Sequence, residues 1–325
     1  MPLSNLKHAL TAAAGCYCAL RLLPAGARDH FIQARAASAA SEQPGKNLFA
    51  LLQAKTAAKG VNPAVSVGEA HTCIVNAEGE VTCFGRQTQC NVPSDLGAVL
   101  EVSAGSSHTC AVRTDGRLVC FGSNRQGQCD VPADLGQVLT VSVGREFTCA
   151  LRTNGEVVCF GAAPSHWVTP PLVALSAGSG HVCGVKADGQ LLCFGQTQEG
   201  QCDVPDDVGP VLDVSAGGFH TCAIKPDGRL RCFGDNDEGQ CGVPADLGSV
   251  LAVSSGVFHT CAVKTTGQLV CFGRNREGQC DVPADLGPVL SVSAGFFHTC
   301  AVRTDGQVVC FGDNEAGQCS VPGSA

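Results

Sequence analysis

The sequence predicts an all-β repeat fold, because one unit of about 39 residues occurs seven times and each unit contains three stretches typical of short strands. In the last unit, residues 289–322, these stretches read VLSVSAG, HTCAVR and QVVCFG. A unit of this length cannot bury its apolar face alone, so such repeats pack side by side as a solenoid or a propeller. The seven units therefore predict one domain, at residues 61–325.

The second and third stretches of each unit predict a β-hairpin whose loop ends in glycine. Alternation along the second stretch of the last unit places His298, Cys300 and Val302 on one face. A two-residue type I′ turn would demand positive φ at Thr266 in the sixth unit, which is strained for a β-branched residue. We therefore predict a three-residue loop in which only the glycine, Gly306 in the last unit, has positive φ.

This register places the two cysteines of each hairpin opposite each other. In the last unit Cys300 faces Cys310 at a non-hydrogen-bonded site, where Cα atoms approach to about 4.5 Å. Disulfides, buried thiols and zinc ligands are three open interpretations of these pairs. The third unit lost its histidine and its third cysteine but kept both paired cysteines, which favours a bond between them. The candidate pairs are Cys73 with Cys83, Cys110 with Cys120, Cys149 with Cys159, Cys183 with Cys193, Cys222 with Cys232, Cys261 with Cys271 and Cys300 with Cys310.

The charge is distributed unevenly around a net value of −8. Residues 1–60 contain seven Lys or Arg and two acidic residues, whereas residues 61–325 contain 14 basic and 27 acidic residues. An acidic repeat domain binds phosphate backbones poorly, so nucleic acid is not expected as a direct partner. The sequence contains no uninterrupted run of about 18 apolar residues, so a membrane-spanning helix is not expected. The chain has no phosphate-binding glycine loop and no Ser-His-Asp signature, so we predict neither an enzyme nor a cofactor.

Residues 1–46 do not follow the repeat and are a predicted leader or flexible extension. Leu6, Leu10 and Leu20 fall at helical spacing, and basic residues with few acids are typical of an organelle transit peptide. A plain extension is an equal alternative, and a secretory signal fits less well because Arg21 interrupts the apolar stretch. We therefore expect an organelle-targeted or cytoplasmic protein more than a secreted one. Residues 47–60 predict a short helix or linker that packs against one end of the domain.

The repeated unit resembles the regulator-of-chromosome-condensation repeat. The resemblance rests on the pattern AG-x-x-HTCAV-x-x-DG-x-VVCFG-x-N-x-x-GQ, with the first cysteine and Phe311 where that family usually has leucine and tryptophan. The continuation GQC-x-VP is similar to that of the secreted bacterial β-lactamase-inhibitor propellers of the same superfamily. The resemblance implies a seven-bladed β-propeller with three main strands per blade.

Members of this superfamily include an exchange factor for a small GTPase, ubiquitin-ligase accessory domains, a plant photoreceptor and enzyme inhibitors. The resemblance therefore implies a non-enzymatic propeller that binds a protein partner through one face. One alternative is an exchange factor or regulator of a small GTPase, and another is a proteinaceous enzyme inhibitor. The photoreceptor depends on clustered tryptophans, and a single tryptophan does not fit that role.

Six units carry a histidine two residues before the first cysteine, and the third unit has Phe147 there. Histidine and cysteine at this spacing share a strand face and could bind zinc. Metal-free members of the family widely have this histidine, which implies a structural residue that hydrogen-bonds backbone, so we predict no metal site. The third cysteine of a unit, such as Cys319, stands at a family leucine position, which implies a buried thiol.

Two variable residues separate the strand-ending glycine from this histidine in each unit. Strand-to-strand loops of a propeller gather on one face, so these pairs predict a ring of partner-binding residues there. The alternative is that the second residue of each pair is core, because phenylalanine is so often buried. The third unit also differs in its charged pair and in carrying the only tryptophan. The predicted partner-binding residues are Phe219, Val257, Phe258, Phe296, Phe297, Arg145, Glu146 and Trp167.

Overall fold

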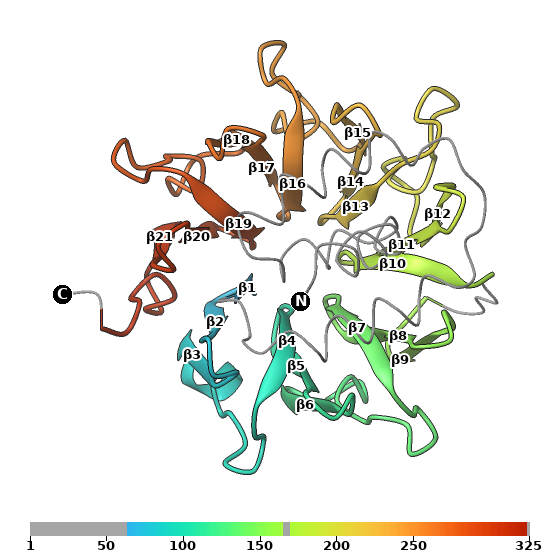
Figure 1. Ribbon diagram of the computed structural model, residues 1–325, viewed down its shortest axis with the longest axis vertical. Helices are drawn as coiled ribbons and strands as arrows, with labels where there is room; N and C mark the ends of the chain where they lie inside the picture. The colour runs from blue at the N-terminus through green and yellow to red at the C-terminus, as the bar shows by residue number, and fades with distance from the viewer. Residues whose placement is uncertain (1–63, 165–169, 324–325) are drawn as a thin grey trace, which may run out of the picture.

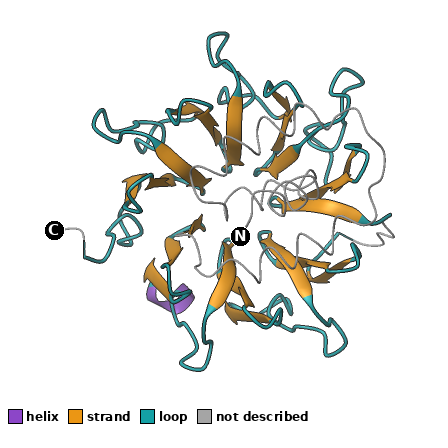
Figure 2. Cartoon of the chain, viewed as in Figure 1, coloured by secondary structure: helices purple, strands orange, loops and turns teal. Residues whose placement is uncertain are grey.

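The computed structural model describes residues 64–164 and 170–323, so the predicted leader (1–46) and short helix (47–60) lie outside the described residues. The described residues form seven three-stranded antiparallel sheets that surround a central axis like blades (Figure 1). Each sheet consists of three strands that are consecutive in the chain, which confirms the predicted seven-bladed propeller. Loops connect the strands, and a 3-10 turn, η2 (Gln87–Gln89), follows the first sheet (Figure 2).

The three strands of each blade follow one another from the axis to the rim (Figure 1). The inner strands are β1 (Ala64–Val67), β4 (Val99–Ala104), β7 (Val138–Val143), β10 (Leu172–Ala177), β13 (Asp213–Ala216), β16 (Val250–Ser255) and β19 (Val289–Ala294). The middle strands are β2 (His71–Val75), β5 (His108–Arg113), β8 (Phe147–Arg152), β11 (His181–Lys186), β14 (His220–Ile224), β17 (His259–Lys264) and β20 (His298–Arg303). The outer strands are β3 (Val81–Gly85), β6 (Leu118–Gly122), β9 (Val157–Gly161), β12 (Leu191–Gly195), β15 (Leu230–Gly234), β18 (Leu269–Gly273) and β21 (Val308–Gly312).

The hairpin between the middle and outer strands has the predicted register. In blade seven the Arg303 N–H donates to the Gln307 carbonyl at 2.8 Å, and Gly306 has φ 89°, which closes a three-residue loop. Cys300 therefore pairs with Cys310, and their Cα atoms are 4.1 Å apart. The structure forms this disulfide in every hairpin, as the favoured interpretation predicted. The bonds are Cys73–Cys83, Cys110–Cys120, Cys149–Cys159, Cys183–Cys193, Cys222–Cys232, Cys261–Cys271 and Cys300–Cys310.

The middle strands are buried on both faces because each blade packs between two others. In β20 all residues from His298 to Val302 are buried, and only Arg303 at its end is half-buried. The apolar core is therefore a series of clusters at the seams between blades. The cluster that joins blade seven to blade one contains Val65, Val67, Cys300 and Val302, so packing closes the ring.

Serine hydroxyls on the inner strands link each blade to the next. Ser66 Oγ accepts the Ala104 N–H at 2.9 Å, and Ser293 Oγ accepts the Val67 N–H at 3.0 Å, which returns the pattern from the last blade to the first. The same bond crosses the other five seams through Ser103, Ser142, Ser176, Ser215 and Ser254. Side chains and loop backbone bonds, such as that from the Val99 N–H to the Gly79 carbonyl at 2.9 Å, thus join the blades, since no sheet of the described residues combines strands from two units. No helix in the described part of the chain is long and apolar enough to cross a membrane.

Candidate functional site

The channel along the propeller axis is narrowest where a glycine follows each inner strand. A Cβ atom on Gly68 would collide with the carbonyl oxygen of Gly105 in the next blade, so the close approach requires glycine. The same carbonyl accepts the Glu69 N–H at 3.3 Å. The space left at this waist is about 90 Å³. The waist glycines are Gly68, Gly105, Gly144, Gly178, Gly217, Gly256 and Gly295.

A wider space opens on each side of this waist. On one side, the loops that follow the glycines line a cavity of about 850 Å³, which we call the basin. On the other side, the inner strands line a cavity of about 330 Å³. The basin is the candidate functional site, because six of the seven variable residue pairs of the repeat contribute to its wall.

The basin brings together seven of the eight predicted partner-binding residues, and Trp167 lies outside the described residues. Phe219, Phe258, Phe296 and Phe297 are half-buried, whereas Val257 is buried with 7% of its surface exposed. The four phenylalanines are therefore neither fully exposed on the surface nor fully buried in the core. They pack against one another and still present part of their surface to the basin.

Three phenylalanines from consecutive blades form a row along the basin wall. The ring centres of Phe219 and Phe258 are 6.2 Å apart, and those of Phe258 and Phe297 are 6.4 Å apart. Phe296 meets Phe297 edge-on at 6.1 Å. These separations lie within the range of favourable aromatic pairs. Blades five to seven thus contribute one continuous apolar wall, which we call the phenylalanine row (Phe219, Phe258, Phe296 and Phe297).

Arg274, which follows β18, packs against the phenylalanine row. Its guanidinium carbon is 5.4 Å from the ring centre of Phe258 and 5.3 Å from that of Phe297. Its Nη2 is 2.6 Å from Glu277 Oε1, so a carboxylate holds the cation in place. A cation over an aromatic face contributes about 0.5–2 kcal/mol. Arg274 therefore fixes the positions of two rings in the row.

Sequence reasoning missed Arg274, although the hairpin register contains the signal that locates it. The pairing of middle and outer strands, continued past the last strand residue, places the residue after each Phe-Gly beside the variable pair. Arg274 N–H accordingly donates to the Phe258 carbonyl at 2.9 Å. Asp235 makes the same bond to Phe219, and Asp313 makes it to Phe297.

The wall across from the phenylalanine row carries charged side chains beside apolar ones. It comes from blade three, which lies across the axis from blades six and seven (Figure 1). Arg145 and Glu146 are exposed here, and Arg145 also lines the waist, so its side chain spans the entrance to the axial channel. Glu69 of blade one and Ser179 of blade four also line the basin. The site therefore opposes an apolar wall to one that carries both signs of charge.

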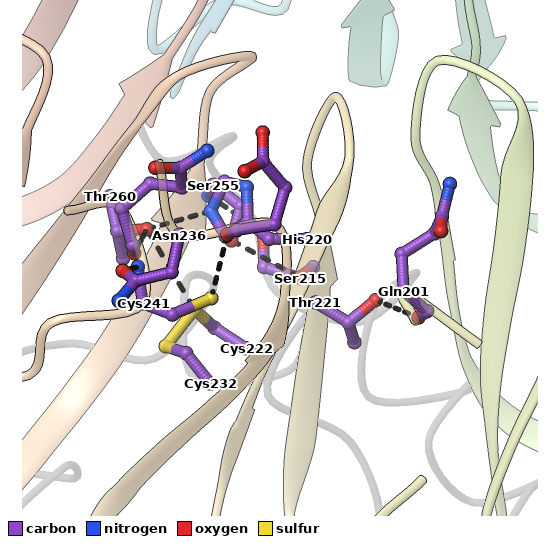
Figure 3. Close-up of a disulfide and its surroundings, with 12 residues drawn as sticks. Gln201, Ser215, His220, Thr221, Cys222, Cys232, Asn236, Cys241, Ser255 and Thr260 are labelled. Atoms are coloured by element: carbon purple, nitrogen blue, oxygen red, sulfur yellow. Dashed lines mark hydrogen bonds between the residues drawn. A yellow bond between two sulfur atoms is a disulfide. The ribbon is translucent and has the colours of Figure 1, made fainter. Parts of the chain in front are cut away.

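The six histidines are fully buried between blades. His220 Nε2 lies 2.8 Å from Thr260 Oγ1 of the next blade (Figure 3). Thr260 Oγ1 donates to the Gln240 carbonyl at 2.8 Å. A hydroxyl has only one proton, so Thr260 accepts from Nε2–H, and the imidazole is neutral with an unprotonated Nδ1. The expected backbone partner is therefore wrong, because the histidine bonds a threonine side chain. The other pairs are His71 with Thr109, His108 with Thr148, His181 with Thr221, His259 with Thr299 and His298 with Thr72.

Burial gives these histidines a strongly lowered pKa. The imidazole loses its hydration in the seam, and this lowers the pKa of His71, His108, His181 and His259 to about 4. The pKa of His220 and His298 falls to about 3, since neighbouring histidines add to the effect of burial. Within the described ranges, no group of three or more His, Cys, Asp or Glu side chains is arranged to hold a metal ion.

The seam between blades three and four differs from the other six. Phe147 stands in place of the histidine and Val182 in place of the threonine, and the two pack in one apolar cluster with Cys149. The third unit also lacks the Gln-Cys step that elsewhere supplies the carbonyl acceptor. The loss of the polar pair is therefore complete on both sides of the seam, and an apolar contact replaces it.

In the six units that have a third cysteine, it is a free, half-buried thiol, so the expectation of a buried thiol is too strong. In blade five, Cys241 packs against the cluster that contains Cys222 and Cys232 (Figure 3). Its thiol donates to the Asp235 carbonyl at 3.2 Å. Burial, together with the charge of Asp235, raises the pKa of Cys241 to about 12. A thiol held in its protonated form is a poor nucleophile, so the Cys241 thiol is not expected to attack the neighbouring disulfide.

Comparison with known proteins agrees with this architecture. The regulator of chromosome condensation (RCC1) repeat matches residues 99–128, 138–163, 172–201, 211–240, 250–279 and 289–318, which together make up more than half of the chain. Blade one is the unit that the repeat does not match, although it forms the same three-stranded sheet. No curated protein matches the chain.

Solved structures show the same fold. The ectodomain of the receptor kinase CR4 from Physcomitrella patens is 25% identical, with a TM-score of 0.68 over 78% of this chain and 73% of that one. The ectodomain of the receptor kinase ACR4 from Arabidopsis thaliana is 24% identical, with a TM-score of 0.63 over 78% and 97%. Prp20p from Saccharomyces cerevisiae is 17% identical, with a TM-score of 0.63 over 79% and 82%. With six matching repeats and seven blades, the chain belongs to the regulator of chromosome condensation (RCC1) repeat family.

Proposed function

We propose that this propeller binds a protein partner through the basin and catalyses no reaction. The observation that carries the proposal is the phenylalanine row, whose four rings keep part of their surface open to a concave site. Partly exposed aromatic residues in a hollow are typical anchors of protein interfaces. The similarity to a receptor kinase ectodomain supports a binding role for the propeller.

The shape and chemistry of the basin define the partner's contact. A concave site of about 850 Å³ accepts a protruding loop or the end of a helix, and a flat surface would leave it unfilled. Covering one phenylalanine side chain contributes about 1.5–3 kcal/mol, so two or three rings can supply most of the affinity of a specific complex. Arg145 and Glu146 on the opposite wall then orient the partner through charge.

The groups available in the basin support binding more than catalysis. Its titratable side chains are Glu69, Arg145 and Glu146, and none of them pairs with a histidine there. The histidines of the described blades are committed to threonines in the seams and are neutral at physiological pH. The acidic balance of residues 61–325 favours a protein partner over a nucleic acid.

The proposal is tested by removing two rings of the row. A partner is first identified by proximity labelling with the full chain, and its affinity is then measured with purified proteins. The variant Phe258→Ser/Phe296→Ser should weaken binding by at least about tenfold, because two apolar anchors are lost. The matched control is Leu290→Ser, a half-buried apolar residue on the other side of the waist, which should leave the affinity unchanged.

Circular dichroism and thermal unfolding must show that both variants keep the fold. An unchanged dissociation constant for a folded Phe258→Ser/Phe296→Ser variant would place the interface elsewhere. Accelerated nucleotide release from a small GTPase by the unmodified chain would instead favour an exchange factor. Inhibition of an enzyme by the purified propeller would favour the inhibitor alternative.

A further inference from the structure

The loops that follow the outer strands differ in charge from one half of the ring to the other. Those of blades one and two, residues 86–89 and 123–127, contain Arg86 and Arg125 and no acidic residue. Those of blades four to seven contain seven acidic and two basic residues. These four loops are residues 196–200, 235–239, 274–278 and 313–317. The acidic half of this face is therefore the half that contains the phenylalanine row.

Both basic residues of the acidic half are already paired. Arg274 Nη2 lies 2.6 Å from Glu277 Oε1, and Arg276 Nη2 lies 3.1 Å from Glu238 Oε1 of the neighbouring blade. Only 19% of the Arg274 side chain is exposed, because it packs against two rings of the row. These cations therefore leave the other carboxylates of the acidic half without an ion-pair partner in their own loops.

Three exposed carboxylates in this half make no ion pair with any residue that the structure describes. They belong to Glu199 of blade four, Asp237 of blade five and Glu315 of blade seven. Asp235 and Asp313, by contrast, accept backbone N–H groups of their own loops. The carboxylates of Glu199, Asp237 and Glu315 can therefore bind a cationic group of a partner.

Asp237 and Glu315 lie near the two ends of the phenylalanine row. The loop of blade five begins with an N–H that donates to the Phe219 carbonyl at 2.9 Å, and the loop of blade seven begins in the same way at Phe297. Each carboxylate residue follows two steps later, and two residue steps span at most about 7 Å. Lysine and arginine have long flexible stems. A basic residue beside an apolar one on the row can therefore reach either carboxylate.

The charges that line the basin have the same balance. Glu69 and Glu146 are two acidic lining residues, and Arg145 is the one basic lining residue in the described part of the wall. Arg145 belongs to blade three, across the axis from blades six and seven (Figure 1). An acidic partner would meet like charges over the phenylalanine row, whereas a basic partner would meet opposite ones.

We propose that the partner of the basin is a protein segment that is both apolar and basic. Its apolar side chains cover the phenylalanine row, and its Lys or Arg side chains pair with Asp237 and Glu315 on either side of blade six. The inference rests on the proposed function, because it assigns the chemistry of the partner that the same basin binds.

Selection from a random peptide library tests this inference. A library of random peptides displayed on phage is panned on the full chain, and the enriched sequences are compared with the unselected library. We expect enrichment of apolar residues beside Lys or Arg and a net positive charge. One enriched peptide is then synthesised with a fluorophore, and its dissociation constant is measured by fluorescence anisotropy.

Charge variants locate the carboxylates that the peptide uses. Asp237→Asn/Glu315→Gln should weaken binding about threefold to tenfold, because two exposed ion pairs are lost. The matched control, Asp246→Asn/Asp285→Asn, removes the same charge from exposed residues of the connections that lead to β16 and β19, and it should leave the affinity unchanged. Added salt should weaken binding to the unmodified chain more than to the Asp237→Asn/Glu315→Gln variant, since salt screens exposed charges.

The outcomes separate this inference from the proposed function. Enriched peptides that are neutral or acidic, and that bind Phe258→Ser/Phe296→Ser weakly, would overturn the inference and leave the proposed function standing. A basic peptide that binds this phenylalanine variant as tightly as the unmodified chain would overturn both. Equal weakening by the two charge variants would show a general attraction to an acidic domain and would overturn the inference, as would a selection that enriches no peptide.

Discussion

At the scale of single residues, Phe147 and Val182 show why the seams tolerate only paired changes. In six seams a buried histidine donates from Nε2 to a threonine hydroxyl, whereas its Nδ1 has no hydrogen-bond partner. A buried donor without an acceptor costs about 1–3 kcal/mol, whereas an apolar pair of similar shape costs little. Phe147 and Val182 form such an apolar pair. A change on the threonine side alone would leave the imidazole unpaired, whereas a threonine without its histidine still donates to the Gln carbonyl.

A double-mutant cycle at this seam tests that argument. Phe147→His alone should destabilise the propeller by about 2–3 kcal/mol, because the imidazole loses hydration without gaining an acceptor. Val182→Thr alone should cost about 1–2 kcal/mol for a buried hydroxyl. The double variant should be more stable than the sum of these costs by about 1 kcal/mol, since the imidazole then donates to the hydroxyl as His108 does to Thr148, although the third unit lacks the Gln carbonyl that accepts from Thr148. Urea unfolding of the four proteins measures the coupling, and purely additive costs would contradict it.

At the scale of the element, each hairpin is stabilised by a bond that depends only on local register. Cys300 and Cys310 are ten residues apart and face each other because of the three-residue loop between them. The free thiol of Cys319 in the same unit instead donates one weak hydrogen bond to the Asp313 carbonyl at 3.2 Å. Two kinds of cysteine in one repeat therefore contribute very differently to stability.

This difference can be measured in blade seven. In protein prepared under oxidising conditions, Cys300→Ser/Cys310→Ser should lower the free energy of unfolding by about 3 kcal/mol, because the unfolded chain regains the freedom of a ten-residue loop. Cys319→Ser should change it by less than about 1 kcal/mol, since a hydroxyl can donate to the same carbonyl. Non-reducing urea titrations provide the comparison. Equal effects of the two changes would show that the Cys300–Cys310 disulfide adds no more stability than the free thiol of Cys319.

The element is also the scale at which the sequence was most informative. Loop length, the glycine at positive φ and the pairing of Cys300 with Cys310 all follow from residues within one hairpin, so the sequence predicted them correctly. Contacts between blades join residues about 40 positions apart, as for His220 and Thr260. The sequence of a single unit does not show which face of its strand packs against the next unit. The joint replacement of histidine and threonine by Phe147 and Val182 was the signal of that contact, and it is visible only once both units are compared.

The candidate site also has some features that follow from the sequence of one unit and others that depend on contacts between blades. The position of the variable pairs on one face follows from topology, and the basin contains all the predicted residues that the structure describes. The depth of each ring does not follow from the sequence, because it depends on stacking between blades, such as that of Phe258 on Phe297. The hairpin register places Arg274 beside Phe258 of its own blade, whereas its contact with Phe297 crosses to the next blade and does not follow from one unit.

At the scale of the whole molecule, the seams form a closed ring. Blade seven reaches blade one through Ser293 and Val67, through His298 and Thr72, and through the Thr72 hydroxyl bond to the Gln318 carbonyl. Opening any one seam exposes two blade faces at once, so the blades should unfold together. Any condition that weakens all seams equally should therefore act on the entire ring.

Acid is such a condition, because six seams contain a histidine that must stay neutral. The pKa of these histidines is about 3 to 4 in the fold and 6.5 for the free group. Since the folded pKa is the lower one, the unfolded chain takes up the extra protons below about pH 6.5. The stabilisation is complete above that pH and is lost as the pH falls toward the folded pKa. Each histidine contributes up to about 1.4 kcal/mol per pH unit, so six together remove several kcal/mol per unit.

Urea unfolding between about pH 7.5 and pH 4.5 measures this slope. The matched control is His181→Phe/Thr221→Val, which copies the apolar seam of Phe147 and Val182 into the next seam around the ring. Loss of the threonine bond to the Gln201 carbonyl lowers stability at every pH and leaves the slope untouched. The slope itself should fall by about 1.4 kcal/mol per pH unit, because one titrating group is gone. A propeller whose stability stays constant down to about pH 4.5, or a slope that the double change does not reduce, would show that the seam histidines do not govern the acid response.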